Sequence, residues 1–271
     1  MYELGIIGAG NMAEAIARGV MAKSLLRAGQ IIAADVSPQR RELFEKQLGV
    51  KAVEQNADVA RQSRTVLLSV KPQQMAEALA ALAPAMSDQT LVVSIAAGIS
   101  TTFIEKHLGG GDGKRWRVVR VMPNTPMLVG EGMSGIARGM NASDDDVATV
   151  RRLFESAGDV IEVGEDKMNA VTAISGSGPA YFFLLVEQMI VAGVDMGLSP
   201  QHARQLAAKT ALGAAKMLVT SPDAPQELRR KVTSPGGTTH AAIAHMQSHN
   251  VPERIVEAIK AAERRGRELG S

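Results

Sequence analysis

Short apolar runs recur through the first 164 residues, and between them apolar positions are spaced three and four apart. Small or turn-forming residues follow the runs, so we interpret them as buried strands that are joined by helices. Alternating strands and helices are typical of an α/β fold with a parallel, doubly wound sheet. The predicted strands cover residues 4–7, 31–35, 50–53, 65–70, 90–95, 117–122, 134–138 and 160–163.

The pattern changes near Gly164, after which only helical periodicity remains. We therefore predict two domains, an α/β domain over residues 1–164 and an all-α domain over residues 165–271. A glycine-rich surface loop is expected at residues 109–113 of the first domain. The helices predicted for the second domain cover 166–174, which ends at a stretch of small residues, then 180–196 and 200–218, and two more that begin at His240 and Pro252.

The predicted helix over residues 180–196 is apolar on almost every side, with interruptions at Glu187, Gln188 and Asp195. It is too short and too interrupted for a membrane span. A helix that is apolar all round must be buried by protein, and little chain remains to cover it. We therefore predict that a partner subunit covers it, which makes the second domain a dimerisation domain.

The first predicted strand leads into Gly8-Ala9-Gly10-Asn11-Met12-Ala13, a G-x-G-x-x-A pattern at the start of a helix. A strand, a glycine turn and a helix are the context that a dinucleotide-binding turn requires. Gly8 permits the tight turn, Gly10 lets a pyrophosphate approach the backbone, and Ala13 keeps the helix near the strand. The motif favours a Rossmann-type nucleotide site, and the alternative is a tight turn without a ligand.

The second predicted strand ends in Asp35, about 22 positions after the glycine motif, where a carboxylate binds the ribose of NAD. Ser37 is the expected N-cap of the next helix. Arg40 and Arg41 lie one turn inside that helix and favour the 2′-phosphate of NADP, unless they belong to a solvated face. The sequence carries both signals, so the choice between NADP(H) and NAD(H) stays open here.

Composition removes several other classes of function. The 271 residues carry a net charge of +2 with scattered basic residues, which argues against nucleic-acid and membrane partners. Aromatic residues make up only 3%, too few for stacking on bases. The chain has no cysteine, so disulfides, thiol chemistry and cysteine metal sites are excluded. Met1-Tyr2-Glu3 leads directly into the first strand, and we expect a cytoplasmic protein without a signal peptide.

Two loops of small residues stand out in the helical domain, at residues 175–179 and 234–239. Each places hydroxyls and free backbone N–H groups at the start of a helix, which suits a carboxylate or a phosphate. An ordinary turn between helices is the alternative, but two such loops beside a nucleotide fold favour a ligand site. His245 and His249 are four residues apart without an accompanying carboxylate motif, so we predict no metal site.

These motifs together resemble the pyrroline-5-carboxylate reductases, the last enzymes of proline biosynthesis. The resemblance covers nearly the whole chain, and its most specific part is Val232-Thr233-Ser234-Pro235-Gly236-Gly237-Thr238-Thr239-His240-Ala241. It also includes the glycine turn, Val70-Lys71-Pro72, residues 94–98, Met122-Pro123-Asn124-Thr125-Pro126, residues 170–181 and the segment from Leu228.

The resemblance implies an oxidoreductase that reduces 1-pyrroline-5-carboxylate to L-proline with NADPH or NADH. It also implies a homodimer formed by the helical domain, often assembled further into rings. Together with the residues argued above, the expected cofactor-binding set is Gly8, Ala9, Gly10, Asn11, Met12, Asp35, Ser37, Arg40, Asn56, Val70, Lys71, Pro72, Ala96, Ala97 and Gly98. The expected substrate-binding set is Asn124, Glu165, Ser175, Gly176, Ser177, Gly178, Gly236, Gly237, Thr238 and Thr239, with Thr239 as the catalytic residue.

The residue inventory fits this reaction. The substrate is a cyclic imine, and an iminium already accepts hydride well, so the enzyme needs positioning more than a strong acid or base. The Thr239 hydroxyl is expected to hydrogen-bond the ring nitrogen, and the N–H groups near Gly237 and Thr238 to hold the carboxylate.

Two other functions are weighed. The first is another NAD(P)-dependent dehydrogenase, acting on a different imine or of the β-hydroxyacid type. The β-hydroxyacid type needs a catalytic lysine in the helix that follows the loop at 175–179, and residues 180–186 contain none. A nucleotide-sensing protein without catalysis has no use for a second ligand loop at residues 236–239.

Overall fold

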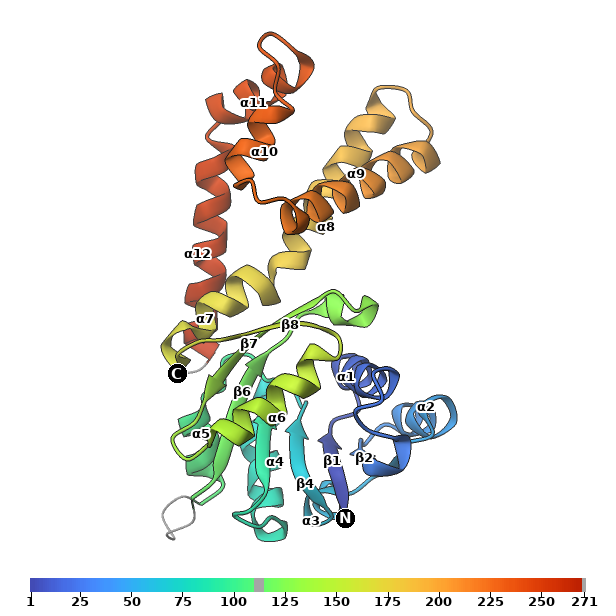
Figure 1. Cartoon of the computed structure of the whole chain (residues 1–271), viewed down its shortest axis with the longest axis vertical. Helices are drawn as coiled ribbons and strands as arrows, with labels where there is room; N and C mark the ends of the chain where they lie inside the picture. The colour runs from blue at the N-terminus through green and yellow to red at the C-terminus, as the bar shows by residue number, and fades with distance from the viewer. Residues whose placement is uncertain (110–114, 270–271) are drawn as a thin grey trace. The chain divides into compact units, whose positions relative to one another are not determined.

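The computed structural model describes residues 1–109 and 115–269 (Figure 1). Two compact units are formed, Gly178–Ala261 and Met1–Ser177, the latter joined by the end of helix α12 (Val251–Leu269) from Ala262 onward. The sequence predicts a domain boundary after residue 164, where the strands end and only helices follow. The packed units divide elsewhere because α7 (Met168–Val171) contacts the sheet and Gly266 of α12 lies against Asn169. The predicted loop at 109–113 lies, beyond its first residue, outside the described residues.

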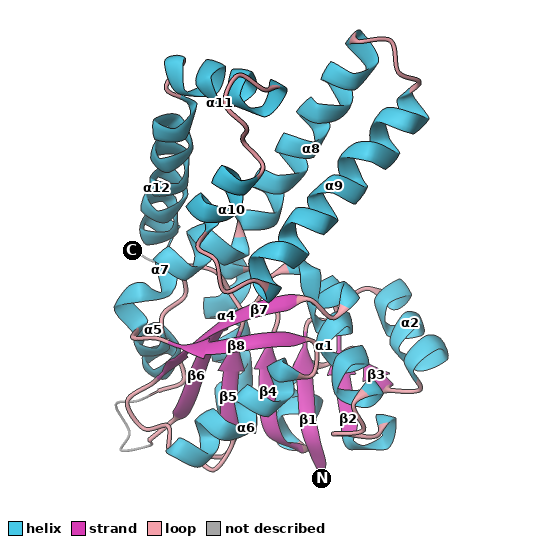
Figure 2. Ribbon diagram, turned by 45° about the horizontal axis from the view of Figure 1, so that its top comes forward, coloured by secondary structure: helices cyan, strands magenta, loops and turns pink. Residues whose placement is uncertain are grey.

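All eight predicted strands are present, and they form one sheet with the order β3-β2-β1-β4-β5-β6-β7-β8 (Figure 2). The α/β fold is thereby confirmed. The strands are β1 (Tyr2–Ile7), β2 (Ile31–Ala34), β3 (Lys51–Val53), β4 (Ser63–Leu68), β5 (Leu91–Ser94), β6 (Arg117–Met122), β7 (Gly132–Arg138) and β8 (Gly158–Glu162).

The sheet is not wholly parallel, which corrects the expectation. Strand β7 runs antiparallel to β6, while every other neighbouring pair is parallel. A parallel neighbour needs a crossover of a dozen or more residues. Only residues 123–131 join β6 to β7, and they contain a short 3₁₀ turn, η4 (Thr125–Val129), so the chain can only reverse direction.

Helices follow the strands as the spacing of apolar positions predicts, and hydroxyls of Ser37, Ser100, Ser143 and Ser199 cap four of them. The helices of the first unit are α1 (Asn11–Ala22), α2 (Pro38–Leu48), α3 (Asn56–Arg61), α4 (Met75–Leu82), α5 (Thr101–His107), α6 (Asp144–Glu155) and α7. Those of the second unit are α8 (Gly178–Asp195), α9 (Pro200–Thr220), α10 (Pro225–Lys231), α11 (Thr238–Ser248) and the first part of α12.

The sheet is buried on both faces. Side chains of a strand point alternately to opposite faces, and in β1 Leu4 and Ile6 join one apolar cluster while Ile7 joins the other. Helices α1, α2 and α6 cover the first cluster, and α3, α4 and α5 cover the second. This double covering leaves the carboxyl ends of the parallel strands as the edge at which a ligand can bind.

In the second unit, α8 and α9 pack closely through small residues. A Cβ atom at Gly193 would lie 3.0 Å from the Cβ of Ala203, and Ala203 and Ala207 are buried. These helices also carry exposed apolar side chains, among them Phe182 at 59% and Phe183 at 68%. The apolar surface predicted for residues 180–196 is thus present and uncovered within this unit.

The segment Glu165–Asp195 is long and apolar enough to cross a membrane by length and composition alone, because an 18-residue window within it has a mean hydropathy of 1.4. The segment is not one uniform helix. It begins with the 3₁₀ turn η5 (Glu165–Lys167) and α7, continues through a π-helical turn, η6 (Thr172–Gly176), and only then enters α8. The sequence predicts a loop at residues 175–179. The structure instead has a wider, π-helical turn there, which leads directly into α8.

Candidate functional site

The glycine turn between β1 and α1 has the geometry that a phosphate-binding turn requires. Gly8 has a φ of +92°, and a Cβ atom there would lie 2.8 Å from the Ser69 carbonyl oxygen, so no larger residue fits. Gly10 is the N-cap of α1, and among the described residues no atom lies within 4 Å of its Cβ position and no side chain caps the helix. The first N–H groups of α1 are therefore open to an anion.

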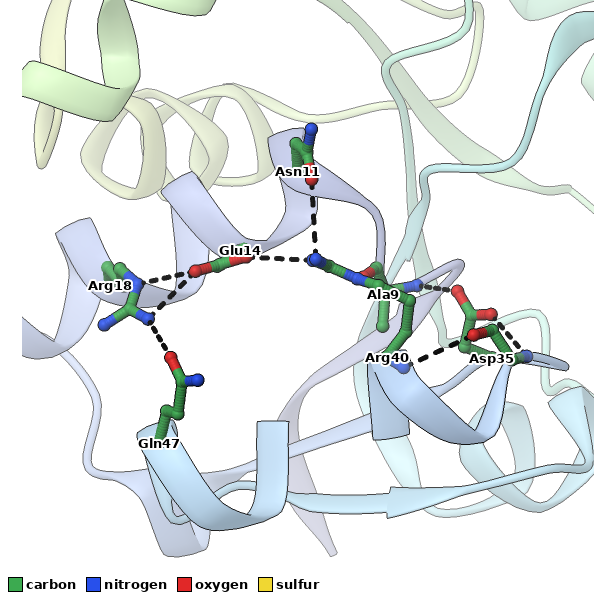
Figure 3. Close-up of polar contacts among 8 residues, drawn as sticks. Ala9, Asn11, Glu14, Arg18, Asp35, Arg40 and Gln47 are labelled. Carbon is green, nitrogen blue, oxygen red and sulfur yellow. Dashed lines mark hydrogen bonds and ion pairs between the residues drawn. The ribbon is translucent and has the colours of Figure 1, made fainter. Parts of the chain in front are cut away.

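Asp35 shapes this turn (Figure 3). Its carboxylate accepts hydrogen bonds from the N–H groups of Ala9 and Ser37, at 2.7 and 2.8 Å. The Ser37 hydroxyl in turn accepts the N–H of Arg40 at the first turn of α2, at 3.4 Å. One carboxylate thus fixes the glycine turn to the start of α2, next to the place where a ribose is expected.

Arg40 reaches from α2 to the same turn. Its Nε donates to the Ala9 carbonyl, and its Nη1 lies 3.4 Å from Asn11 Oδ1. Its Nη2 forms an ion pair with Glu14 at 3.0 Å (Figure 3). All three guanidinium nitrogens therefore hold the turn, and with 23% of the side chain exposed Arg40 is not part of a solvated face.

Arg41 has a looser setting. Its Nη1 donates to the carbonyls of Asp35 and Val36, at 2.8 and 3.1 Å. Its Nη2 pairs at 3.5 Å with Glu54, whose side chain is 63% exposed. The Arg41 side chain is 21% exposed, but its partner Glu54 is exposed, so this ion pair contributes little and can be replaced by a pair with another anion.

A cavity of about 390 Å³ lies at the carboxyl edge of the sheet beside the glycine turn. The predicted cofactor residues that line it are Gly8, Gly10, Asp35, Asn56, Val70 and Lys71. Those that do not line it are Ala9, Asn11, Met12, Ser37, Arg40, Pro72, Ala96, Ala97 and Gly98. Asn56 is the first residue of α3, and Gln55 is the N-cap of this helix.

The sequence interpretation missed one wall of this cavity. It is formed by the segment after Lys71-Pro72, through Gln74, Glu77, Ala78 and Ala81. These residues are spaced three and four apart, so they lie on one side of a helix. That spacing, read together with the turn at Lys71-Pro72, was the signal that could have identified them.

A second cluster of predicted site residues lies in the first unit, where Asn124 meets Ser175 of the π-helical turn η6. The Asn124 Nδ2 donates to the Ser175 carbonyl at 3.2 Å and lies 3.4 Å from the Ser175 hydroxyl. The Asn124 Oδ1 accepts the N–H of Met133 at 2.9 Å. The structure therefore brings these two predicted substrate residues together. Gly176 and Ser177 follow in the same turn.

Glu165 pairs with a buried arginine. Its Oε1 lies 2.6 Å from Arg120 Nη1 of β6, and only 4% of the Arg120 side chain is exposed. Burial raises the pKa of the nearby Glu105, a bond from the Met140 N–H lowers it, and the negative charge of Glu165 raises it further. Glu165 is the ion-pair partner of Arg120, a role that the sequence did not indicate.

We expect Glu165→Gln to lower the free energy of unfolding of the protein by about 1–2 kcal/mol, because it leaves the buried Arg120 charge uncompensated. Asp166→Asn is the matched control, since Asp166 is 72% exposed and pairs with the exposed Lys167. Urea unfolding of both variants measures the difference. Equal midpoints for the two variants would show that the Arg120 pair contributes no stability.

The second loop of small residues begins α11 in the second unit. Gly236 has a φ of +72°, and Gly237 is the N-cap, its own N–H bonded to the Ser234 carbonyl at 3.0 Å. Within the described residues no side chain caps this helix, so its first N–H groups are open. Thr239 is half-buried on the first turn, while Thr238 is exposed.

The predicted substrate residues are divided between the two units. Asn124, Glu165, Ser175, Gly176 and Ser177 belong to the first, and Gly178, Gly236, Gly237, Thr238 and Thr239 belong to the second. Their joint action on one ligand remains a prediction. Within the described residues, no group of three His, Asp or Glu side chains is placed to hold a metal ion.

Comparison with known proteins gives two family matches. The family described as "Pyrroline-5-carboxylate reductase dimerisation" matches residues 165–269, and "NADP oxidoreductase coenzyme F420-dependent" matches residues 3–98. A pyrroline-5-carboxylate reductase of Pseudomonas aeruginosa is 42% identical over 98% of this chain and 96% of its own length.

Solved structures agree with the sequence comparison. A pyrroline-5-carboxylate reductase from Coxiella burnetii superposes with a TM-score of 0.89 at 35% identity, covering 100% of this chain and 99% of the other. A pyrroline carboxylate reductase of Plasmodium falciparum with NADP bound also has a TM-score of 0.89, at 30% identity, and covers 100% of this chain and 98% of its own.

Proposed function

Because the chain belongs to the pyrroline-5-carboxylate reductase family, we propose that it reduces 1-pyrroline-5-carboxylate to L-proline by hydride transfer from NAD(P)H, the last step of proline biosynthesis. The observation that carries this proposal is the open turn at Gly10, beside a cavity lined by six of the expected cofactor residues. The test is oxidation of NADPH by the purified protein with pyrroline-5-carboxylate, compared with a 2-hydroxy and a 3-hydroxy acid in the reverse direction.

The residues of the turn fit a nicotinamide dinucleotide. The open N–H groups at the start of α1 suit the pyrophosphate, and Lys71 supplies a positive charge in the cavity wall. NADP(H) is the proposed cofactor, with NAD(H) also accepted, and the related Plasmodium falciparum protein was solved with NADP bound. When bound, the reduced nicotinamide supplies the hydride.

The substrate is proposed to lie against the start of α11. The open N–H groups there suit its carboxylate, and the Thr239 hydroxyl suits its ring nitrogen. Because an iminium accepts hydride readily, orienting these two groups is the main task of the protein. No side chain has to act as a strong acid or base.

The two other functions make different predictions in the same assay. A β-hydroxyacid-type dehydrogenase would oxidise the hydroxy acids, although residues 180–186 of α8 contain no lysine for that chemistry. A nucleotide-sensing protein would bind cofactor without turnover of any of these compounds. Turnover of pyrroline-5-carboxylate alone supports the proposed function.

The two arginines of α2 are expected to differ in their effect on cofactor choice. Arg41→Ala should weaken NADPH binding about tenfold and leave NADH binding nearly unchanged, because its exposed pair with Glu54 can give way to a 2′-phosphate. Arg40→Ala should weaken both cofactors, because Arg40 holds the glycine turn. Dissociation constants from fluorescence titration measure this. If Arg41→Ala weakened the binding of NADPH and NADH equally, Arg41 would not recognise the 2′-phosphate.

Assembly as a homodimer is proposed from the exposed apolar side chains of α8 and α9, and the proposal extends to a ring of such dimers. Light scattering at micromolar concentration is expected to give twice the chain mass or a multiple of it. Pelleting with lipid vesicles is expected to leave the protein in the supernatant. A monomer, or a protein that sediments with the vesicles, would contradict the proposal.

A cytoplasmic location belongs to the same proposal, as does the expectation that neither nucleic acid nor membrane is a partner. The chain contains no cysteine, so its stability does not depend on an oxidising compartment.

A further inference from the structure

The π-helical turn η6 has a local cause in the sequence. In an α-helix the carbonyl of each residue accepts the N–H of the residue four positions later, and Ser175 has Pro179 in that position. Proline has no N–H, and its ring crowds the carbonyl four residues before it. The chain passes this point with a wider turn, in which the N–H of Ser177 donates to the Thr172 carbonyl at 2.8 Å.

Asn124 provides the hydrogen-bond donor that Pro179 lacks. Its Nδ2 donates to the Ser175 carbonyl at 3.2 Å, from a side chain at the end of β6. Its Oδ1 is engaged as well, by the N–H of Met133 in β7 at 2.9 Å. Asn124 is only 8% exposed, so its carboxamide is enclosed and bonded to protein at both ends.

The same contacts hold the Ser175 hydroxyl. The Ser175 Oγ lies 3.4 Å from Asn124 Nδ2 and 3.3 Å from the Met133 carbonyl oxygen. Two protein groups therefore set its direction before any ligand arrives.

We propose that Asn124 is a positioning residue and not a substrate contact: its carboxamide replaces the missing N–H of residue 179 and thereby fixes the Ser175 hydroxyl for the substrate. The replacement of the missing N–H concerns the protein alone. The role of the Ser175 hydroxyl toward the substrate rests on the proposed function. This changes the expectation drawn from the sequence, in which Asn124 itself touches the substrate.

A double-mutant cycle on stability tests whether the Asn124 carboxamide replaces the missing N–H of residue 179. Asn124→Asp keeps the acceptor for the Met133 N–H and replaces the amide donor to Ser175 by a carboxyl oxygen. Pro179→Ala restores an N–H four residues after Ser175. We expect Asn124→Asp to shift the urea midpoint clearly in the native background and much less with Pro179→Ala present. Additive shifts would overturn the proposal, and Asn124→Ala serves in the same cycle if the aspartate variant does not fold.

Kinetics with Asn124→Asp and Ser175→Ala, singly and together, test whether Asn124 acts on the substrate through the Ser175 hydroxyl. Each single variant should raise the KM for pyrroline-5-carboxylate about 5- to 10-fold, since one neutral hydrogen bond is lost or misdirected. The double variant should be no worse than the poorer single one, and the NADPH dissociation constant should stay unchanged. Multiplying effects would show that Asn124 contacts the substrate directly. If the native protein does not reduce pyrroline-5-carboxylate, the proposed function fails while the stability cycle still decides the role of Asn124.

Discussion

Gly10→Val will leave the protein folded and weaken NADPH binding about 100-fold or more. The Cβ position of Gly10 meets no described atom within 4 Å, so the folded protein has room for the side chain. The same space is the approach to the open N–H groups of α1. A valine there denies the pyrophosphate at least two charge-assisted hydrogen bonds, and about 3 kcal/mol corresponds to more than 100-fold in affinity.

Gly29→Val is the matched control for this prediction. Gly29 also has no described atom within 4 Å of its Cβ position, and it lies in the short turn before β2, away from the cavity lining. The Gly29→Val variant should bind NADPH with the affinity of the native protein. A third variant, Gly8→Val, should fail to fold, because its side chain would clash with the Ser69 carbonyl. Titration and thermal unfolding of the three variants separate binding from stability. An unchanged dissociation constant in Gly10→Val would remove the cofactor from this turn.

The fold could largely be predicted from the sequence because its signals are local. Each strand is an apolar run, and the alternation seen in Leu4, Ile6 and Ile7 follows directly from burial on both faces. The reversed direction of β7 could not be predicted from apolar pattern alone. It depends on the length of one connection, residues 123–131, which is too short for a crossover.

The geometry of the glycine turn could be predicted where a single residue has a fixed backbone task, and could not be predicted where side chains act on one another. Gly8 and Gly10 follow from backbone geometry, and the structure agrees with both. The role of Arg40 depends on Glu14 and the Ala9 carbonyl, which are far from it in the sequence. The pairing of Glu165 with Arg120 is of the same kind, because 45 positions separate the two residues. No local pattern indicates such pairs.

Thr239→Val is expected to reduce kcat/KM for pyrroline-5-carboxylate roughly 10- to 150-fold. The substitution keeps the shape of the side chain and removes its hydroxyl from the first turn of α11, where Thr239 is half-buried beside the open N–H groups. A hydrogen bond to a charged group contributes about 1.5–3 kcal/mol, and its loss in the transition state gives the stated range. The NADPH dissociation constant should stay the same, because Thr239 is not part of the cavity at the glycine turn.

The control is Thr220→Val, the same change at an exposed position at the end of α9, which should leave kcat/KM within about twofold. Both variants are measured with saturating NADPH, and their thermal unfolding is recorded in parallel. A loss smaller than about threefold in Thr239→Val would exclude this hydroxyl from the reaction. A parallel loss of NADPH affinity or of thermal stability would instead mean that the substitution had disturbed the start of α11 and not only removed the hydroxyl.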